Sequence, residues 1–257
     1  GGNLIVDGAH GAHLPFLGVD AFSGCDALIC SAHKTLPALG QSALLFTNGL
    51  DPRRVRQMTS VFGSSSPSYP MMISLDCARD YLDGKGSEEY RRVARRTAAL
   101  RAAFPSLHEG ELRLDPTRLT LTSPDGNALA QALEGENIWP EMADSGHVVL
   151  ILTAQDSEDD LHRLEEALQR HRDLLGTPPI LPPPPMPKSV RSLREALFAP
   201  VERLPLEYCL GRVSAGQLAP YPPGVPVVAP GEVIGEKELA YLREIGYNNS
   251  DVPVMCL

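Results

Sequence analysis

The sequence predicts an α/β fold from three features. Residues 3–6, 26–30 and 42–47 are short apolar runs without polar alternation, which is typical of strands in a sheet covered on both faces. Segments with helical character follow these runs. A second alternation of strand and helix patterns starts near residue 107 and ends at a proline-rich stretch, residues 177–188.

Helices are expected after the first three strands. Residues 51–60 should form one, with Asp51 as N-cap and Pro52 in its first turn. Another is expected over about 71–82. Ser87 is the predicted N-cap of a long arginine-rich helix that stops before the next proline. Its arginines are interpreted as a solvated face rather than a nucleic-acid patch.

The middle of the chain predicts a small α/β unit. Residues 112–122 alternate like a strand or a bent hairpin, and 126–138 look helical. Residues 147–153 are a buried-strand pattern. An amphipathic helix over 157–175 follows, with Ser157 as its cap.

The last part begins after a stiff linker. Residues 177–188 are too rich in proline for a helix or a central strand. A short helix is expected near 189–197. A run rich in proline and glycine at 220–232 then precedes a helix over 235–245.

Composition excludes several classes of protein. An apolar fraction of 43% in 257 residues indicates a folded protein, and a net charge of −9 argues against a general nucleic-acid-binding role. No apolar run approaches the roughly 20 residues that span a bilayer. The odd, scattered cysteines suggest neither a zinc site nor a disulfide framework, which favours a cytosolic location; they are Cys25, Cys30, Cys77, Cys209 and Cys256.

The first residues suggest that the sequence is part of a longer protein. The sequence starts "GGNLIVDGAH", without Met and with a buried-strand pattern almost at once. We therefore expect the C-terminal part of a longer protein. A cloning scar or an incomplete gene model is the alternative.

Asp7 and Lys34 are the residues most suggestive of chemistry. Each follows an apolar strand pattern, and ligands of open α/β sheets bind at the carboxyl ends of strands. An amine and a carboxylate in one crevice are what pyridoxal phosphate needs, because the amine binds the aldehyde and the carboxylate keeps the ring nitrogen protonated. Ser31 and His33 could donate hydrogen bonds to the phosphate, or could be an ordinary turn residue and a packed loop histidine.

A metal site is the rival interpretation of "DGAHGAH" at residues 7–13. Asp7, His10 and His13 are residue types that bind zinc. The glycines make a helix with both histidines on one face improbable, and no further ligand cluster stands out. The prediction is therefore that no metal binds.

Three separated motifs carry a family resemblance. The first is "VDGAHGAHLPF" followed by "DALICSAHKTLPALGQSALL", the second is "GSSSPSYPMMISLDCARDYL", and the third is "GRVSAGQLAPYPPGVPVVAPGE". In this order they resemble the Orn/Lys/Arg decarboxylase family of fold-type-I enzymes that depend on pyridoxal phosphate. The resemblance covers nearly the whole chain.

The resemblance implies roles for the site residues. Lys34 would hold the cofactor covalently and Asp7 would contact its pyridinium, with Ser31 and His33 at the phosphate. His10 would lie beside the cofactor and, with Lys34, be catalytic; the proton donor would be Lys34 or a neighbouring histidine. A further group would border the active site of a homodimer or higher homo-oligomer, or else form a capped turn: Ser65, Ser66 and Tyr69.

The resemblance also implies an architecture and an activity. The remainder of a mostly parallel large domain would be followed by a small α/β domain, the linker and a C-terminal decarboxylase domain, over residues 1–104, 105–176, 177–188 and 189–257 respectively. The phosphate-binding loop of the family is not found in these residues. The expected reaction is decarboxylation of arginine, lysine or ornithine to a polyamine precursor. The alternatives are another fold-type-I enzyme, such as an aminotransferase or aldolase, or a non-catalytic interaction subunit.

Overall fold

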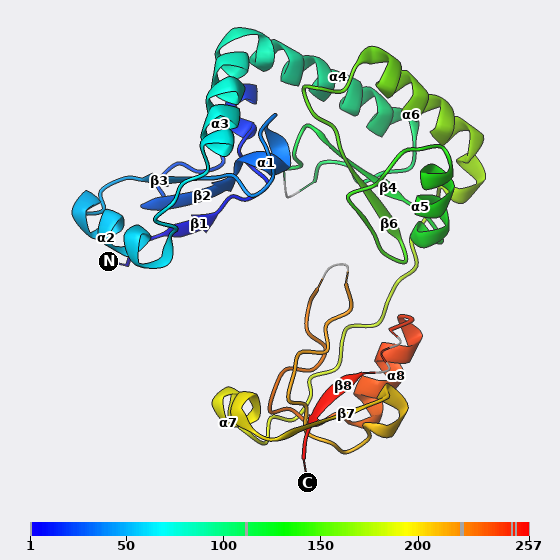
Figure 1. Cartoon of the computed structure of the whole chain (residues 1–257). Helices are drawn as coiled ribbons and strands as arrows, with labels where there is room; N and C mark the ends of the chain where they lie inside the picture. Colours follow the sequence, from blue (N-terminus) through cyan, green and yellow to red (C-terminus); the bar gives the residue numbers. More distant parts are fainter. Residues whose placement is uncertain (1, 111–112, 222–223, 248, 250, 257) are drawn as a thin grey trace.

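The computed structural model describes residues 2–110, 113–221, 224–247, 249 and 251–256, and its fold is α/β as predicted (Figure 1). The strands are β1 (Ile5–Asp7), β2 (Ala27–Ser31), β3 (Ala43–Thr47), β4 (Arg118–Thr122), β5 (Met142–Ala143), β6 (His147–Ile151), β7 (Val201–Leu204) and β8 (Val252–Met255). The helices are α1 (Ala32–Thr35), α2 (Pro52–Phe62), α3 (Tyr69–Tyr81), α4 (Ser87–Ala103), α5 (Gly126–Gly135), α6 (Glu158–Arg170), α7 (Leu193–Phe198) and α8 (Glu236–Glu244).

The first sheet has the strand order β1-β2-β3. β1 and β2 are parallel, with Asp7 opposite Ile29. β2 and β3 are antiparallel, with Ser31 opposite Ala43. Residues 32–42 connect β2 to β3 and are too few for the crossover of about a dozen or more residues that parallel pairing requires. The parallel pairing expected from the sequence therefore holds between β1 and β2.

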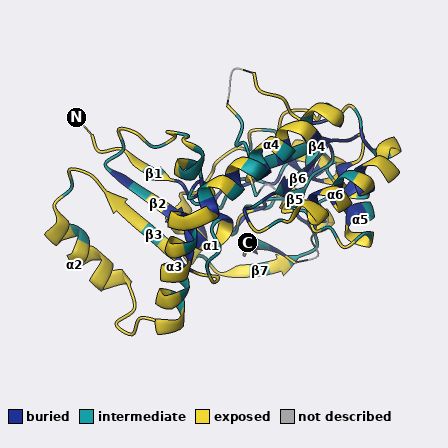
Figure 2. Ribbon diagram, turned by 90° about the horizontal axis from the view of Figure 1, so that it is seen from above, coloured by how far each residue is buried: buried dark blue, intermediate teal, exposed yellow. Residues whose placement is uncertain are grey.

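The outer strands of this sheet, β1 and β3, are largely exposed to solvent. Ile5, Leu45 and Phe46 are 64%, 46% and 53% exposed, and β3 is mostly yellow in Figure 2, whereas the central strand β2 is largely buried or half-buried. α3 lies across one face over an apolar cavity of about 610 Å³. The side chains between them include Leu28 of β2 and Leu75 of α3. The sheet therefore positions the ends of β1 and β2, but it has no well-packed hydrophobic core of its own.

A continuous helical rod connects this sheet to the next part of the chain. The predicted N-cap role of Ser87 is wrong: Ser87 is the first residue of α4, but α3 passes through a π-helical segment, Leu82–Gly86, directly into α4, so no helix end needs a cap there. The glycine-containing sequence there suggests a break, but tertiary packing overrides it. Leu82 and Tyr90 are buried together and pack against Phe16 from the loop after β1.

The second sheet, of order β4-β6-β5, carries the largest core. α4, α5 and α6 cover it, and their buried residues include Leu100, Leu133 and Leu168. Ser157 caps α6 as predicted, in a reciprocal capping box with Asp160. Residues 111 and 112, at and just before the start of the predicted strand or hairpin over 112–122, lie outside the described residues.

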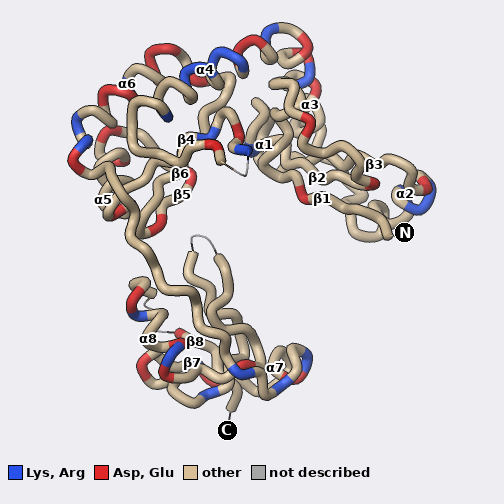
Figure 3. The backbone as a smooth tube through the Cα atoms, turned by 180° about the vertical axis from the view of Figure 1, so that it is seen from behind, with Lys and Arg blue, Asp and Glu red and all other residues tan. Residues whose placement is uncertain are grey.

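Two of the arginines on α4 are not simply solvated. Arg92 and Arg96 are only 23% and 31% exposed and pair with acids on α6. Arg92 reaches Glu158 at 2.9 Å, and Arg96 reaches Glu165 at 3.1 Å. Figure 3 shows basic and acidic residues side by side along these two helices. The ion pairs of Arg92 and Arg96 thus hold α4 against α6.

The last part of the chain has a separate core. Residues 177–188 contain neither helix nor strand and lead into it (Figure 1). Antiparallel β7 and β8 pack with α8 around Leu218, Ile234 and Leu242. The sequence patterns do not reveal β7 or β8, and residues 222–223 of the proline-rich run lie outside the described residues. Over the described part of the chain, no helix is both long and apolar enough to cross a membrane.

Candidate active site

Two neighbouring strand ends bring Asp7 and Lys34 to one place. Asp7 ends β1, and Lys34 lies in α1, the single helical turn that begins where β2 ends. The parallel register of these strands puts both ends at the same edge of the sheet. The backbone N–H of Gly8 donates to the carbonyl of Ile29 at 2.8 Å, which extends the pairing beyond Asp7. This is the arrangement that the sequence predicts for a ligand-binding edge.

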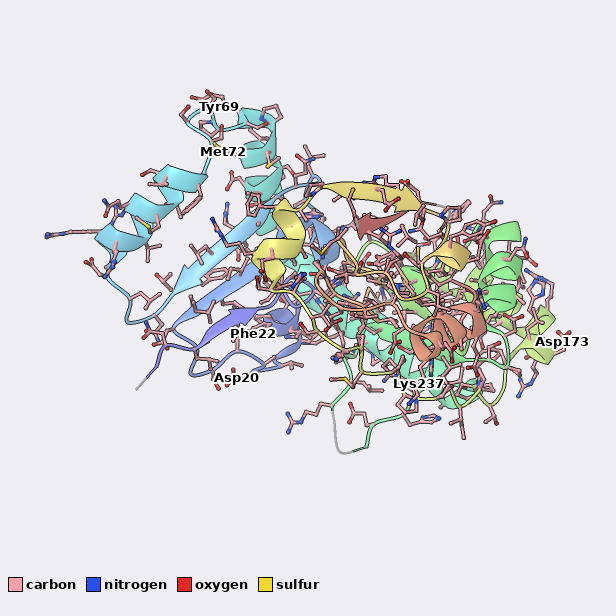
Figure 4. All side chains as sticks on the ribbon, turned by 90° about the horizontal axis from the view of Figure 1, so that it is seen from below. Asp20, Phe22, Tyr69, Met72, Asp173 and Lys237 are labelled. Atoms are coloured by element: carbon pink, nitrogen blue, oxygen red, sulfur yellow. The ribbon has the colours of Figure 1, made fainter. Side chains whose placement is uncertain are left out.

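Both side chains line an open hollow of about 590 Å³. His10 and the aromatic ring of Phe22 line it too, from the loop between β1 and β2. Figure 4 labels Phe22 beside the sheet. The apolar cavity under α3 is a different space, and none of the predicted site residues lines it. The polar hollow is therefore where the predicted chemistry converges.

His10 contacts Lys34 directly. Its Nε2 lies 3.2 Å from Nζ of Lys34. Asp7 is held by a local contact, because its Oδ1 accepts a hydrogen bond from the backbone N–H of Ala9 at 3.0 Å. The structure thus brings three of the predicted site residues to one hollow.

Two further residues that the sequence did not predict as site residues line the hollow. Arg118, the first residue of β4, donates from Nη2 to Nδ1 of His10 at 3.2 Å and to its carbonyl at 3.3 Å. Asp115 lies beside it, with Oδ2 3.8 Å from Nε of Arg118. The segment that contains them predicts only a strand or hairpin. The only signal in the sequence is the run Asp115-Pro116-Thr117-Arg118 at the start of the predicted strand, and nothing in it indicates that the strand starts at the hollow.

His13 does not face the hollow with His10. It is 1% exposed, and its Nε2 lies 3.1 Å from Oδ1 of Asp115 and 2.9 Å from Oγ1 of Thr117. It also packs against the ring of Tyr90, with the ring centroids 5.6 Å apart. Within the described residues, no group of three or more His, Cys, Asp or Glu side chains is arranged to hold a metal ion. His13 thus forms a buried polar contact between the two sheets.

Ser31 and His33 do not line the hollow. His33 is exposed, and its Nδ1 lies 2.9 Å from the carbonyl of Ser42. Because a carbonyl only accepts, Nδ1 carries the proton in this contact and Nε2 points elsewhere. Ser31 precedes α1, and its side chain makes no capping hydrogen bond there.

The polar segment before α3 is far more open. Ser65 and Ser66 are exposed, and Tyr69 is 73% exposed. Figure 4 shows Tyr69 and Met72 at the outer end of α3. These residues are not among those that line the hollow.

The charges around the hollow favour a neutral imidazole. Burial lowers the pKa of His10, and the positive charges of Lys34 and Arg118 lower it further, against the opposing effects of Glu141 and Asp7. Burial also lowers the pKa of the Arg118 guanidinium, an effect that Asp115 opposes. A guanidinium nevertheless remains charged at neutral pH.

Asp115 stays ionised beside these groups. Burial alone would raise its pKa, but the hydrogen bond from His13 and the N–H of Thr117 outweigh burial and lower it. The hollow therefore combines a primary amine, a neutral imidazole, a carboxylate and an arginine paired with an acid. Such a set can bind an aldehyde at the amine and a protonated ring nitrogen at the carboxylate of Asp7.

Two family models match the chain. The model described as Orn/Lys/Arg decarboxylase, major domain, matches residues 4–124, and the one described as Orn/Lys/Arg decarboxylase, C-terminal domain, matches residues 183–254. Together they match most of the chain, including the ends of β1 and β2, α1 and the start of β4.

Individual proteins are similar over nearly the whole chain. The uncharacterized protein YaaO of Bacillus subtilis is 30% identical over 94% of this chain and 55% of its own length. An arginine decarboxylase of the same organism is 30% identical over 93% of this chain and 55% of its own length. The chain thus spans about half the length of these curated relatives.

A solved structure shows the same fold. The constitutive lysine decarboxylase of Escherichia coli superimposes with a TM-score of 0.75 at 17% identity, over 99% of this chain and 54% of the solved chain. At that identity the likeness is one of fold.

Proposed function

The chain belongs to the Orn/Lys/Arg decarboxylase family, as its motifs predict, and from this membership we propose that it provides part of the active site of an enzyme that decarboxylates a basic amino acid. Relatives at about 30% identity are named arginine decarboxylases, and relatives over shorter stretches are named lysine decarboxylases. These names support arginine or lysine as the substrate class, with ornithine as the remaining candidate. The product would be an amine that feeds polyamine synthesis.

One observation carries the proposal. Lys34, Asp7 and His10 come from two strand ends and the loop between them, and all three line a single hollow. The contact of 3.2 Å between His10 Nε2 and Lys34 Nζ joins two of them directly. Without this convergence, family membership alone would leave the site unassigned.

The same residues fit pyridoxal phosphate as the cofactor. Lys34 offers the primary amine that can hold the aldehyde, and Asp7 offers a carboxylate for the ring nitrogen. When bound, this cofactor supplies an aromatic ring that accepts the electron pair released as carbon dioxide departs. Ser31 and His33 remain the proposed phosphate contacts, and Nε2 of His33 is the nitrogen that could make one.

The side chains of this chain then have separable roles. Asp7 keeps a proton on the nitrogen of the cofactor ring by placing a negative charge beside it. His10, whose pKa is lowered by its surroundings, is neutral at pH 7 and contacts the Lys34 amine at the hollow. Lys34 or His10 returns a proton to the α-carbon of the substrate once the carboxylate has left.

We also propose the division into parts that the sequence predicts. Residues 1–104 would be the remainder of the large domain, 105–176 the small domain and 189–257 the C-terminal domain, joined through the linker at 177–188. A homodimer or larger homo-oligomer would bring a second copy to the exposed residues Ser65, Ser66 and Tyr69. The free cysteines support a cytosolic location.

The test is an assay of carbon dioxide release from arginine, lysine and ornithine. It should be run on the 257-residue chain and on the longest reading frame that contains it, each supplied with pyridoxal phosphate. Release from one of the three, lost in Lys34→Ala, supports the proposal. Cofactor binding without release from any of them would overturn it, and conversion of the cofactor to its amine form by a keto acid would identify an aminotransferase instead.

A further inference from the structure

The ring of Phe22 lies between the polar hollow and the apolar cavity under α3. The hollow, which Asp7 and Lys34 line, measures about 590 Å³, and the cavity measures about 610 Å³. Among the described residues, Gly11 and Phe22 are the only ones that line both spaces. Because Gly11 has no side chain, the ring of Phe22 is the wall between them.

Two glycines of the loop after β1 leave the space that this ring fills. A Cβ at Gly11 would lie 2.4 Å from Cζ of Phe22, and a Cβ at Gly8 would lie 3.0 Å from its Cε1. Carbon atoms in contact prefer a separation of about 3.5–4.0 Å, so a side chain at Gly11 would have to displace the ring. Gly8 and Gly11 therefore form a seat for Phe22.

The wall stands beside the carboxylate that is proposed to contact the cofactor. Gly8 directly follows Asp7, and its N–H donates to the carbonyl of Ile29 at 2.8 Å, which holds this part of the loop against β2. Of the described residues that line the hollow, Phe22 and Leu14 are the large apolar ones. Because pyridoxal phosphate has a flat aromatic ring, it would gain from an apolar surface at this place.

Loss of the Phe22 ring would change the hollow on this side. The apolar cavity behind it is lined mainly by carbon, from side chains such as Leu28 and Leu75. Without the ring, the hollow would open into that cavity, and a ligand in the hollow would lose its contact with the wall. The ring of Phe46 lines the cavity but not the hollow, so its loss would leave the wall in place.

We propose that Phe22 is a ligand-positioning residue, whose ring, seated on Gly8 and Gly11, closes the hollow against the apolar cavity and confines a flat aromatic ligand beside Asp7. The ring acts by contact and takes no part in the reaction. This inference rests on the proposed function in one respect, the identity of the ligand as pyridoxal phosphate.

The first experiment tests the seat and needs no ligand. Thermal unfolding of the 257-residue chain is measured for Gly11→Ala, for Phe22→Leu and for the double variant. Gly11→Ala should lower the midpoint by about 3 °C or more, because the added methyl group must displace the ring. With Phe22→Leu present, the shorter side chain lacks the Cζ atom, and the same change should have less than half that effect. Equal losses in both backgrounds would overturn the seat and with it the proposal.

The second experiment measures the binding of pyridoxine phosphate, which has the ring and the phosphate of the cofactor but no aldehyde for Lys34. Its dissociation constant is measured by fluorescence titration of the 257-residue chain and of the longest reading frame that contains it. Phe22→Ala should weaken binding by about fivefold or more, the effect of losing an apolar contact on a ring. Phe22→Leu, which keeps an apolar wall, should bind within about twofold of the parent.

The double variant also separates this role from a general loss of structure. Gly11→Ala alone should weaken binding of pyridoxine phosphate, because it displaces the ring of Phe22. Adding Phe22→Leu should restore binding, since the shorter side chain leaves room for the methyl group. Equal weakening in the single and the double variant would overturn the proposal.

Phe46→Ala is the matched control for the binding experiment. It removes a ring from the apolar cavity but not from the hollow, and binding should stay within about twofold of the parent. Equal binding by the parent and Phe22→Ala, with the fold retained by circular dichroism, would overturn the role of Phe22 and leave the proposed cofactor in place. Absence of binding by the parent at both lengths would instead overturn the cofactor, so the two failures are distinguishable.

Discussion

Nε2 of His13 lies 3.1 Å from Oδ1 of Asp115, although 102 residues separate them in the chain. His13 belongs to the loop after β1, and Asp115 belongs to the turn before β4. Thr117 donates its hydroxyl to the same carboxylate oxygen at 2.9 Å. This buried contact fixes the distance between the sheet that carries Lys34 and the strand that carries Arg118.

Asp115→Asn should destabilise the chain in a pH-dependent way. At pH 7 we expect the free energy of unfolding to fall by about 1–3 kcal/mol, because buried hydrogen bonds to a charged group are lost. The pKa of Asp115 is lowered in the folded state, so its contribution is present above the unfolded pKa of roughly 3.9 and is lost as the pH falls through the folded pKa. Urea denaturation at pH 7 and at pH 3 measures the difference.

The difference in unfolding free energy between the parent chain and Asp115→Asn should therefore be smaller at pH 3 than at pH 7. Asp173→Asn is the control, since Asp173 is exposed, in the short turn after α6 (Figure 4). It should change stability little at either pH. If Asp115→Asn lowered the unfolding free energy by the same amount at pH 7 and pH 3, the carboxylate charge would not be what stabilises the contact.

Tyr90→Phe should loosen the turn that carries Lys34. The hydroxyl of Tyr90, which is 1% exposed, donates to the carbonyl of Thr35, the residue after Lys34. Its loss leaves that carbonyl without this donor and should cost about 0.5–1.5 kcal/mol of unfolding free energy. Hydrogen exchange of the peptide that covers residues 32–36 should become faster. Tyr81→Phe is the control, because the Tyr81 hydroxyl makes a longer contact of 3.4 Å, to Ala154; similar exchange in both variants would contradict this role of Tyr90.

Lys34→Ala should abolish covalent trapping of pyridoxal phosphate without affecting the fold. Lys34 is exposed, so its loss removes little packing. After borohydride reduction, peptide mass spectrometry should find the cofactor on the peptide that contains Lys34 in the parent chain and nowhere in the variant. Lys85→Ala, which removes another exposed lysine, should leave trapping unchanged. Cofactor recovered mainly on a different lysine would show that Lys34 is not the reacting amine.

The proximity of Asp7 and Lys34 could be predicted from the sequence. Asp7 and Lys34 each follow an apolar run, and the ends of neighbouring parallel strands must lie at one edge of a sheet, so their proximity follows from chain pattern alone. Arg118 could not be found in this way. Its contact with His10 spans 108 residues and depends on how two sheets are held together, which no short-range pattern encodes.

The prediction that Ser87 caps the start of a separate helix is wrong for a related reason. A serine followed by two glutamates after a glycine-containing stretch has the composition of an N-terminus, and local propensity favours a break there. Burial of Leu82 and Tyr90 against the loop after β1 instead keeps the backbone helical through Gly86. The position of Arg118 and the continuity of α3 with α4 both depend on tertiary packing, which the local sequence does not encode.

Gly126→Ala and Gly135→Ala, both on α5, should have opposite effects on stability. A Cβ at Gly126 would lie 2.3 Å from the carbonyl oxygen of Asp144 and 2.8 Å from the backbone nitrogen of His147, so the loop before β6 would have to move. Such a backbone shift should cost roughly 1–3 kcal/mol or more. A Cβ at Gly135 meets no heavy atom of the described structure within 4 Å, and alanine is favoured over glycine in a helix by about 0.5–1 kcal/mol. Thermal unfolding of the two variants measures this contrast directly, and a Gly126→Ala chain as stable as the parent would show that α5 does not sit so closely against β6.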